Sequence, residues 1–405
     1  MANKQRVAIL GSSGSIGTSA LDVMAAHPDR LAVVGLAVHS RIDLLEQQIA
    51  RCHPQMVAVV DEQQAASLAQ RQHGACQVLS GIDGMIHLAT HPEVDTVLIG
   101  TSGPDALIPL IRAIEAGKRI ALASKELLVM AGELIMTLVR RHGVTLIPID
   151  SEHAALFQIL QGVPQEQVER IIVTGSGGSL WGMDAVAMTA VTPPQVLSHP
   201  KWQMGPKITV DSATLMNKGL EIIEAHWLFD LPLDRIKLLI HPEAAVHAIV
   251  ELTDGTCLAQ MSICDMRLPI QFAFSFPDRW PVTLPRLRLA GLAGWHFIEP
   301  DVDRYPCLRL ALEAARVGGS ACTVLSAAND TAVWAYLQGT LAFMEIPRVI
   351  DETLRQHEPQ PHPTLPEIQT ADAWARAMAR ELITRRSRSV LGASEVAEVP
   401  RGHAA

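Results

Sequence analysis

The sequence predicts an α/β protein: an N-terminal doubly wound parallel sheet, then an α+β domain, then a C-terminal helical domain. Two observations predict the sheet. Short apolar segments alternate with helical patterns from residue 5 to residue 149, as in proteins built from repeated strand–helix units. A glycine-rich loop joins the first apolar segment to the first helical pattern, where doubly wound sheets bind dinucleotides. The alternation stops after residue 150, so we expect a different architecture there.

The expected elements follow the chain in order. Strands are expected at residues 7–10, 31–38, 56–60, 96–100, 119–123 and 144–149. Helices are expected up to residue 26, at 41–51, after residue 60, at 104–116 and at 125–142. Two further strands, 246–250 and 257–261, flank Asp254-Gly255, which is a hairpin signal. Residues 276–301 are rich in proline and glycine and indicate a linker, whereas 306–386 indicate three or four helices.

Composition argues against several classes of protein. With 48% hydrophobic and 19% charged residues, the chain is ordinary globular protein. The net charge of −9 argues against a nucleic-acid partner. No apolar run reaches the roughly 18 residues of a membrane span, and the N-terminus lacks the apolar core of a signal peptide. The six cysteines show no CxxC pairing, which indicates reduced thiols in a cytoplasmic protein.

The first glycine loop, Gly11-Ser-Ser-Gly-Ser-Ile-Gly17, suits a pyrophosphate because its N–H groups open a helix. A plain strand–helix turn is the alternative. The second strand ends in His39-Ser40-Arg41, without the acid that accepts from the ribose of NAD. Arg41 could face a 2′-phosphate instead, which favours NADP(H). The alternative for this segment is a solvated helix start capped by Ser40.

The segment Asp150-Ser151-Glu152-His153 follows the strand 144–149. Two neighbouring acids repel each other unless a proton or cation lies between them, so a divalent metal site is one interpretation. A helix start with a capping acid is the other, and on this segment alone it is the commoner origin. Lys125, in Ser124-Lys125-Glu126, follows the strand 119–123 and is expected at the same sheet edge, where it could hold an oxyanion or begin a helix.

Two loops beyond residue 150 carry polar groups. Gly175-Ser-Gly-Gly178 offers N–H and hydroxyl donors to a phosphate, although a flexible turn is the commoner origin of such a sequence. Residues 199–205 place His199, Trp202 and Met204 on a loop bounded by proline and glycine. This pattern is typical of a mobile lid and also of an ordinary loop with a buried tryptophan.

Residues 211–229 predict a helix. At about 100° per residue, Asn217, Lys218 and Glu221 would project from one side of it, opposite an apolar arc. The alternative is a solvated face with a Lys218–Glu221 pair. Gly219 in the middle of this helix costs about 1 kcal/mol relative to alanine. Its presence fits the close approach of a ligand or of another backbone.

Taken in order, these motifs resemble the 1-deoxy-D-xylulose 5-phosphate reductoisomerase family over residues 5–386. The resemblance rests on residues 11–17, 125–126, 150–153, 175–178, 199–205, 211–221, 265–267 and 325–329. It implies an oxidoreductase that uses NADPH and Mn²⁺ or Mg²⁺, with Co²⁺ as a further candidate. The implied reaction converts 1-deoxy-D-xylulose 5-phosphate, a sugar phosphate, to 2-C-methyl-D-erythritol 4-phosphate in non-mevalonate isoprenoid precursor biosynthesis. A retro-aldol and aldol rearrangement would precede hydride transfer.

The resemblance also implies roles for individual residues. Metal ligands with catalytic roles would be Asp150, Glu152 and Glu221, and Lys125 would be catalytic as well. Substrate-binding residues would be Lys125, Ser151, Glu152, Ser176, His199, Ser212, Asn217, Lys218 and Glu221. Cofactor-binding residues would be Ser13, Gly14, Ser15, Ile16, His39, Ser40, Arg41, Ser124, Glu126 and Gly205. Trp202 and Met204 would belong to the lid.

The family's organisation implies a homodimer with three domains in each subunit. In this sequence they would be an NADPH-binding domain at 1–150, a catalytic domain at 151–275 and a C-terminal helical domain at 302–386. A linker at 276–301 and a tail at 387–405 would complete the chain.

Several positions depart from the family pattern. Arg41, Ser124 and Ala154 stand where asparagine is usual, and Ser179 stands where proline is usual. None of these changes removes a proposed metal or phosphate ligand. Two other functions are open on the sequence. An NADP-dependent aldehyde or semialdehyde oxidoreductase without rearrangement would need no three-carboxylate site. A non-catalytic NADPH-binding regulator would be expected to lack a metal or phosphate residue.

Overall fold

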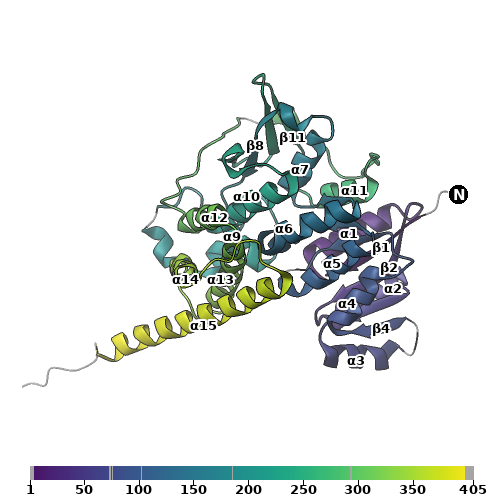
Figure 1. Ribbon diagram of the computed structural model, residues 1–405, viewed down its shortest axis with the longest axis horizontal. Helices are drawn as coiled ribbons and strands as arrows, with labels where there is room; N and C mark the ends of the chain where they lie inside the picture. The colour runs from purple at the N-terminus through teal and green to yellow at the C-terminus, as the bar shows by residue number, and fades with distance from the viewer. Residues whose placement is uncertain are drawn as a thin grey trace, which may run out of the picture. The chain divides into compact units, whose positions relative to one another are not determined.

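The computed structural model describes residues 4–396 except 73, 75, 102, 185, 292 and 293, with side chains to residue 386. Its contacts divide the chain into two compact units (Figure 1). Unit 1 comprises Met1–Ser176, Lys201–Gly205 and Glu221–Pro300, and unit 2 comprises Gly177–Pro200, Pro206–Leu220 and Asp301–Ala405. Because each unit combines separate stretches of chain, the consecutive domains expected from the sequence stay a prediction.

Unit 1 contains the predicted parallel sheet, which has seven strands in the order β4-β3-β2-β1-β5-β6-β7. These are β1 (Gln5–Leu10), β2 (Leu31–Val38), β3 (Met56–Val59), β4 (Gln77–Ser80), β5 (Thr96–Ile99), β6 (Arg119–Leu122) and β7 (Leu146–Pro148). The strand order reverses at β1, which has β2 on one side and β5 on the other. Ligands of open α/β sheets bind at such a switch point, beyond the carboxyl ends of the strands.

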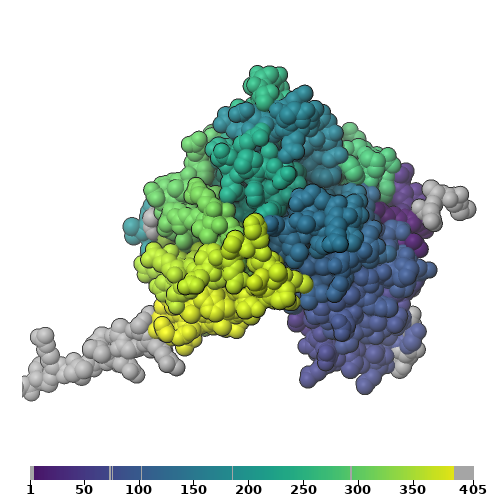
Figure 2. Space-filling model, viewed as in Figure 1, coloured from purple at the N-terminus to yellow at the C-terminus, as the bar shows by residue number. Residues whose placement is uncertain are grey.

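Helices connect these strands and complete the predicted α/β fold. They are α1 (Ser15–Ala26), α2 (Ile42–Cys52), α3 (Glu62–Gln72), α4 (Gly81–Thr90), α5 (Leu107–Glu115) and α6 (Lys125–His142). The last four residues of β1, Val7 to Leu10, are fully buried. Figure 2 shows this part of the chain as one continuous body coloured from purple to blue. Strand β4 and helix α4 were not predicted, because β4 is a half-exposed edge strand with only two apolar residues.

A second sheet of unit 1 has the order β11-β10-β8-β9. It contains β8 (Val168–Gly175), β9 (Ile236–Ile240), β10 (Val246–Leu252) and β11 (Cys257–Met261). The predicted hairpin is confirmed, because β10 and β11 pair in antiparallel fashion. Helices α7 (Ser151–Leu160) and α11 (Arg267–Ser275) belong to the same unit. The predicted linker is mostly irregular, apart from a short 3-10 turn at Leu289–Gly291 and a bridge between Ile240 and Ile298.

Unit 2 contains the predicted C-terminal helices. They are α12 (Pro306–Val317), α13 (Ser320–Leu337), α14 (Glu345–Arg355) and α15 (Leu365–Val396), and the shorter helices α8 (Pro193–Leu197) and α9 (Pro206–Ala213) belong to the same unit. Helix α15 continues past residue 386 to Val396. The prediction of an irregular tail from residue 387 is therefore wrong for residues 387–396. No helix among the residues that the structure describes is both long and apolar enough to cross a bilayer.

The single helix predicted for residues 211–229 is divided in two. Helix α9 ends at Ala213 and α10 (Met216–Phe229) begins three residues later. Leu215 lies between them with a φ of 57°, a left-handed conformation that costs a non-glycine residue roughly 1–2 kcal/mol. The Thr214 hydroxyl accepts a hydrogen bond from the Met216 N–H at 3.3 Å, which helps α10 to begin.

Gly219 on α10 is explained by helix packing. A Cβ built at this position would lie 2.3 Å from the Cβ of Ala311 on α12. This contact supports the predicted close approach of another part of the chain at Gly219.

A second close approach, within unit 1, fixes α6 against α10. A Cβ built at Gly132 of α6 would lie 2.2 Å from the indole of Trp227 on α10. The preceding residue, Ala131, is non-helical (φ −143°, ψ 26°), so α6 bends where it meets this indole. Because α6 begins with Lys125 and α10 carries Glu221, this contact sets the spacing between two predicted site residues.

We expect Gly132→Ala to destabilise the protein. Helix propensity alone would favour alanine by about 1 kcal/mol, but overpacking against the Trp227 ring costs roughly 1–3 kcal/mol. Chemical denaturation should therefore show a free energy of unfolding lower by up to about 2 kcal/mol. The matched control is Gly162→Ala, because no described atom lies within 4 Å of a Cβ there. If Gly132→Ala lowered the free energy of unfolding by the same amount in a Trp227→Leu background, the overpacking explanation would be contradicted.

Candidate functional site

The structure brings the three predicted metal ligands together. Asp150 and Glu152 lie at the start of α7, just after β7, and Glu221 projects from α10. One carboxylate oxygen of each residue lies within 4.8 Å of those of the other two. Such a set of hard oxygen donors suits Mg²⁺ or Mn²⁺. Glu221 is only 1% exposed, so this cluster is not the solvated surface that acidic residues usually form.

Lys125 partly neutralises the carboxylate cluster. Its Nζ pairs with the Asp150 carboxylate and lies 3.1 Å from Oε1 of Glu221. Burial acts to lower the Lys125 pKa, but the charges of Asp150, Glu221 and Glu224 outweigh it and hold this pKa well above its ordinary value. Lys125 therefore stays an ammonium. Its position confirms the predicted shared sheet edge, because β6 and β7 are neighbouring parallel strands.

The helix-cap interpretation of this segment is not supported. Asp150 occupies the N-cap position of α7, yet its side chain caps no N–H group of the described residues. Its carboxylate pairs with Lys125 instead. The Ser151 hydroxyl donates to the Glu152 carboxylate. The polar side chains at the start of α7 thus interact with one another and with Lys125.

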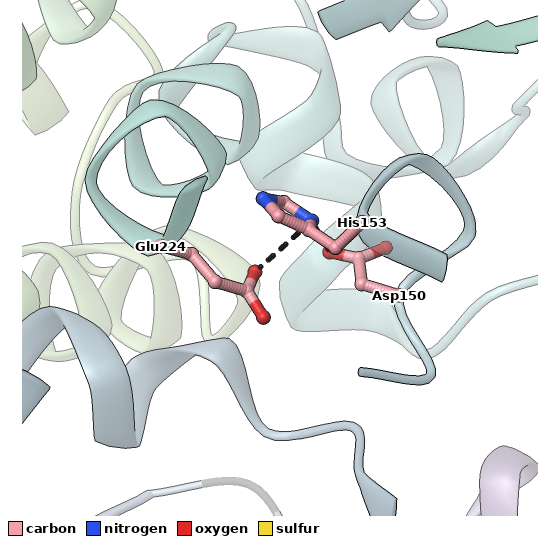
Figure 3. A group of neighbouring side chains, drawn as sticks. All are labelled: Asp150, His153 and Glu224. Carbon is pink, nitrogen blue, oxygen red and sulfur yellow. Dashed lines mark ion pairs between the residues drawn. The ribbon is translucent and has the colours of Figure 1, made fainter. Parts of the chain in front are cut away.

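Sequence reasoning missed Glu224, and it named His153 as part of the Asp150–His153 segment without giving it a role. Figure 3 shows His153 and Asp150, from the start of α7, facing Glu224 of α10. The His153 Nε2 lies 2.9 Å from the backbone carbonyl oxygen of Glu221, and its Nδ1 lies 3.4 Å from Oε2 of Glu224. Nothing in the local sequence distinguishes Glu224 from a surface glutamate of the same helix, since its position depends on burial beside His153.

Burial shifts the pKa of both of these side chains towards the uncharged form. Burial lowers the His153 pKa to about 4. Burial also raises the Glu224 pKa, and the nearby charge of Asp150 raises it further. The contact drawn in Figure 3 joins two buried side chains, and burial disfavours the charged form of each. The Nε2–H of His153 donates to the Glu221 carbonyl, which ties α10 to α7 beside the carboxylate cluster.

The glycine loop after β1 fits a phosphate cradle. Gly11 has a φ of 93°, and a Cβ there would lie 2.8 Å from the backbone of Gly100. A Cβ at Gly17 would lie 2.3 Å from the Gly11 carbonyl oxygen, so these glycines are needed for the turn itself. The loop is anchored by Gln48, which sequence reasoning missed. The Gln48 amide and Ser12 exchange two buried hydrogen bonds, of 2.7 and 2.8 Å.

The predicted cofactor residues 39–41 follow β2, which is the neighbour of β1 in the sheet. Arg41 follows β2, and its guanidinium donates to the Ser13 carbonyl of the glycine loop at 2.8 Å. His39, Ser40 and Arg41 are all exposed. The cap predicted for Ser40 is absent from this described segment, because Arg41 occupies the N-cap position of α2 without a capping side chain.

Ser124 and Glu126 lie on either side of Lys125. Ser124 follows β6, is buried, and donates to the carbonyl of Thr101, which follows β5. Glu126 lies in the first turn of α6.

In unit 2, three predicted phosphate-binding residues lie near the junction of α9 and α10. Ser212, Asn217 and Lys218 are 7%, 8% and 6% exposed, so the solvated-face alternative is wrong. His199 belongs to the same unit, and burial together with the positive charge of Lys218 lowers its pKa. A Cβ at Gly178 would lie 2.5 Å from the Ser212 carbonyl oxygen. The second glycine loop therefore packs tightly on α9.

Four predicted site residues lie on irregular segments of unit 1. Ser176 directly follows β8. Trp202, Met204 and Gly205 lie in the short stretch Lys201–Gly205. The Trp202 ring centroid is 6.3 Å from that of His247 on β10.

Comparison with known proteins gives consistent results along the chain. Family models match at residues 7–132 (1-deoxy-D-xylulose 5-phosphate reductoisomerase), 146–229 (the C-terminal domain of that enzyme) and 261–378 (DXP reductoisomerase C-terminal domain). The 1-deoxy-D-xylulose 5-phosphate reductoisomerase of Heliobacterium modesticaldum is 48% identical over 382 residues, covering 94% of this chain and 97% of that protein. The enzyme of Geotalea uraniireducens is 46% identical over 380 residues, covering 94% and 98%.

Solved structures agree with these relatives. The Zymomonas mobilis reductoisomerase in complex with NADPH superimposes with a TM-score of 0.87 at 36% identity, covering 94% of this chain and 99% of that chain. A DOX-P reductoisomerase in complex with NADPH, fosmidomycin and magnesium gives a TM-score of 0.88 at 37% identity, covering 94% and 98%.

The neutral state of His153 predicts how stability depends on pH. Its folded-state pKa of about 4 lies below the ordinary value of 6.5, so the unfolded chain binds the extra proton first. Stability should therefore fall as the pH drops from 6.5 towards 4, by about 3 kcal/mol from this group. In His153→Gln, the free energy of unfolding should fall less steeply over this window. The raised pKa of Glu224 acts in the opposite direction but is present in both proteins. Parallel curves of unfolding free energy against pH for the wild type and His153→Gln would contradict the lowered pKa of His153.

Proposed function

The chain belongs to the 1-deoxy-D-xylulose 5-phosphate reductoisomerase family, and from this premise we propose which of its residues carry out the reaction. It is an oxidoreductase that converts 1-deoxy-D-xylulose 5-phosphate to 2-C-methyl-D-erythritol 4-phosphate with NADPH and a divalent metal ion. The observation that carries the proposal is the convergence of Asp150, Glu152 and Glu221 around Lys125. A simple aldehyde oxidoreductase would have no use for this cluster.

Asp150, Glu152 and Glu221 would hold the metal ion. Their oxygens are close enough to share one ion and come from two helices that His153 ties together. A bound divalent ion would polarise the ketone and hydroxyl oxygens of the substrate, which favours the proposed retro-aldol and aldol rearrangement. Magnesium is the ion named in the solved structures, and use of Mn²⁺ or Co²⁺ by this chain is a further proposal.

Lys125 and Ser151 would bind the reacting part of the substrate. Lys125 holds its proton on Nζ because the surrounding carboxylates stabilise the charge. It can therefore donate hydrogen bonds to a substrate oxygen on which negative charge develops. Ser151 lies between Asp150 and Glu152 in the sequence, and its hydroxyl contacts the Glu152 carboxylate. It would therefore bind a substrate that is held by the metal-binding carboxylates.

Ser212, Asn217 and Lys218 would bind the substrate phosphate, with His199 alongside and Ser176 as a further donor. A hydroxyl, an amide and an ammonium buried in one unit are donors that suit a dianion. Trp202 and Met204 would form a lid that excludes water from the reacting groups.

The NADPH would bind at the switch point of the parallel sheet. The turn of Ser13, Gly14, Ser15 and Ile16 would hold the pyrophosphate, because its N–H groups open helix α1. Arg41, which already contacts this loop, would face the 2′-phosphate together with His39 and Ser40. Other residues assigned to this cofactor are Ser124, Glu126 and Gly205. The hydride that NADPH supplies would reduce the rearranged aldehyde.

The organisation of the protein in the cell is also proposed. We infer a homodimer in the cytoplasm. Residues 1–150 would bind NADPH, residues 151–275 would carry the catalytic groups, and residues from 302 would form the helical C-terminal domain.

We expect Glu221→Gln to abolish metal-dependent turnover. The wild type should oxidise NADPH, followed by its absorbance, only when 1-deoxy-D-xylulose 5-phosphate and Mg²⁺ are both present. Losing one carboxylate ligand should reduce kcat by at least about 100-fold. The Kd for NADPH should change little, because Glu221 is not a cofactor residue. Glu115→Gln on the surface of α5 is the matched control. Wild-type turnover by Glu221→Gln would overturn the metal assignment.

We expect Arg41→Leu to weaken the preference for NADPH. Removing a charge-assisted contact with the 2′-phosphate should raise the Kd for NADPH roughly tenfold or more and leave the Kd for NADH nearly unchanged. Fluorescence titration with both cofactors measures this difference. Arg51→Leu on α2, which pairs with Asp22, is the control for removing a surface arginine. Equal weakening of NADH and NADPH would show that Arg41 supports the loop only.

A further inference from the structure

We propose that Asn329 of α13 is a positioning residue for the phosphate group of the substrate. It bonds to Asp211, the residue before Ser212, and thereby orients the turn between α9 and α10. The inference rests on the proposed phosphate site at this turn. It gives a role to the segment 325–329, which is part of the resemblance to the family but contains none of the residues proposed to bind substrate, cofactor or metal.

The Asp211 carboxylate is buried near the end of α9, and each of its oxygens has a donor. Asp211 is 1% exposed, and α9 ends two residues later at Ala213. A negative charge near the C-terminus of a helix is unfavourable, and a buried charge is stable only when it is paired. Its Oδ2 lies 2.8 Å from Nζ of Lys207, and its Oδ1 accepts from Nδ2 of Asn329 at 2.8 Å. The ammonium and the amide therefore stabilise this carboxylate together.

The bond from Asn329 is the one of these two that joins α9 to another helix. Lys207 and Asp211 both belong to α9 at i, i+4 spacing, so their pair stabilises that helix by itself. Asn329 lies in the middle of α13, which packs against α9, and it is completely buried. Asparagine is a poor helix former, so its place inside a buried helix fits a tertiary role. Removing its amide would take one donor from a buried carboxylate, which is unfavourable.

Hydrogen bonds within the turn connect Asp211 to the phosphate-binding groups. The Thr214 hydroxyl donates to the Asp211 carbonyl at 3.2 Å and accepts from the N–H of Met216, the first residue of α10. The Leu215 N–H donates to the Ser212 carbonyl at 3.2 Å. Because Leu215 is left-handed, which is unfavourable for a residue with a Cβ, the turn needs support from neighbouring segments. A shift of Asp211 would therefore move Ser212 relative to the phosphate-binding residues of α10.

The proposed phosphate site depends on donors held at fixed positions. A hydroxyl from α9 and an amide and an ammonium from α10 must reach one dianion together, and loss of their spacing lowers affinity. The metal-binding carboxylates and the first glycine loop belong to unit 1, whereas Asn329, α9 and the first turn of α10 belong to unit 2. We therefore expect Asn329 to affect the binding of substrate and to leave the binding of NADPH unchanged.

The variant Asn329→Ala tests this expectation in the full-length protein. The KM for 1-deoxy-D-xylulose 5-phosphate should rise at least about fivefold, and kcat should change by less than about twofold. The inhibition constant of inorganic phosphate, competing with the substrate, should rise by a similar factor, and the Kd for NADPH should stay at the wild-type value. Thr331→Ala is the matched control on α13, because the Thr331 hydroxyl donates to the Ala327 carbonyl of the same helix at 2.8 Å. A general loosening of the fold would instead lower kcat and weaken NADPH.

Exchanging the two bonded side chains tests the contact itself. Asn329→Asp places two carboxylates against each other and should raise the KM further than Asn329→Ala. Adding Asp211→Asn to this variant restores an amide–carboxylate pair in the opposite direction. The KM of the double variant should therefore fall at least about threefold below that of Asn329→Asp, as expected for two residues in contact.

Ser212→Ala separates this inference from the proposed function. If Ser212→Ala keeps the wild-type KM and the wild-type inhibition by phosphate, the phosphate site is wrongly assigned and the inference falls with it. If Ser212→Ala raises the KM but Asn329→Ala does not, the inference alone is overturned. If Asn329→Ala does not fold, the double variant decides, because a KM more than about tenfold above the wild type would then overturn the role of Asn329.

Discussion

Charge compensation around Lys125 is the constraint on which the site depends. A buried ammonium is stable only beside anions, and neighbouring carboxylates are stable only beside cations. Lys125, Asp150 and Glu221 meet both requirements at once. These three residues begin or belong to three different helices, α6, α7 and α10, so the mutual attraction of their charges requires the three helices to converge. A bound divalent cation would add to the same balance, since the carboxylates outnumber the ammonium.

Uncharged contacts then fix the helices that the charges draw together. The Trp227 indole fills the space left by Gly132, which sets the distance between α6 and α10. The neutral His153 imidazole donates to the Glu221 carbonyl, which joins α7 to α10. The His153 contact is at Glu221 itself, whereas Trp227 lies six residues further along α10. A metal ligand whose helix is fixed in this way loses little conformational freedom when an ion binds, which favours affinity.

The sequence predicted the elements whose pattern is local. Apolar runs identified all but one strand of the parallel sheet, and the order of strands and helices placed Lys125 and Asp150 at one sheet edge. Features that depend on tertiary contacts were missed. The break at Leu215 lies between two helical patterns with no proline or glycine to mark it. The partner of Gly219 is Ala311, some ninety residues away. Glu224 looked like any helical glutamate, because its importance comes from burial beside His153 rather than from its spacing.

The order of the strands also determines how an extended cofactor must lie. The glycine loop follows β1, Lys125 follows β6 and Asp150 follows β7, and β5 lies between β1 and β6. At about 4.8 Å between neighbouring strands, the loop and Lys125 are separated by roughly 10 Å along the sheet edge. A dinucleotide whose phosphates rest on the loop therefore has to pass the ends of β5 and β6 to bring its reactive ring to the carboxylates. Ser124 joins these two strand ends through the Thr101 carbonyl, so it lies directly on that path.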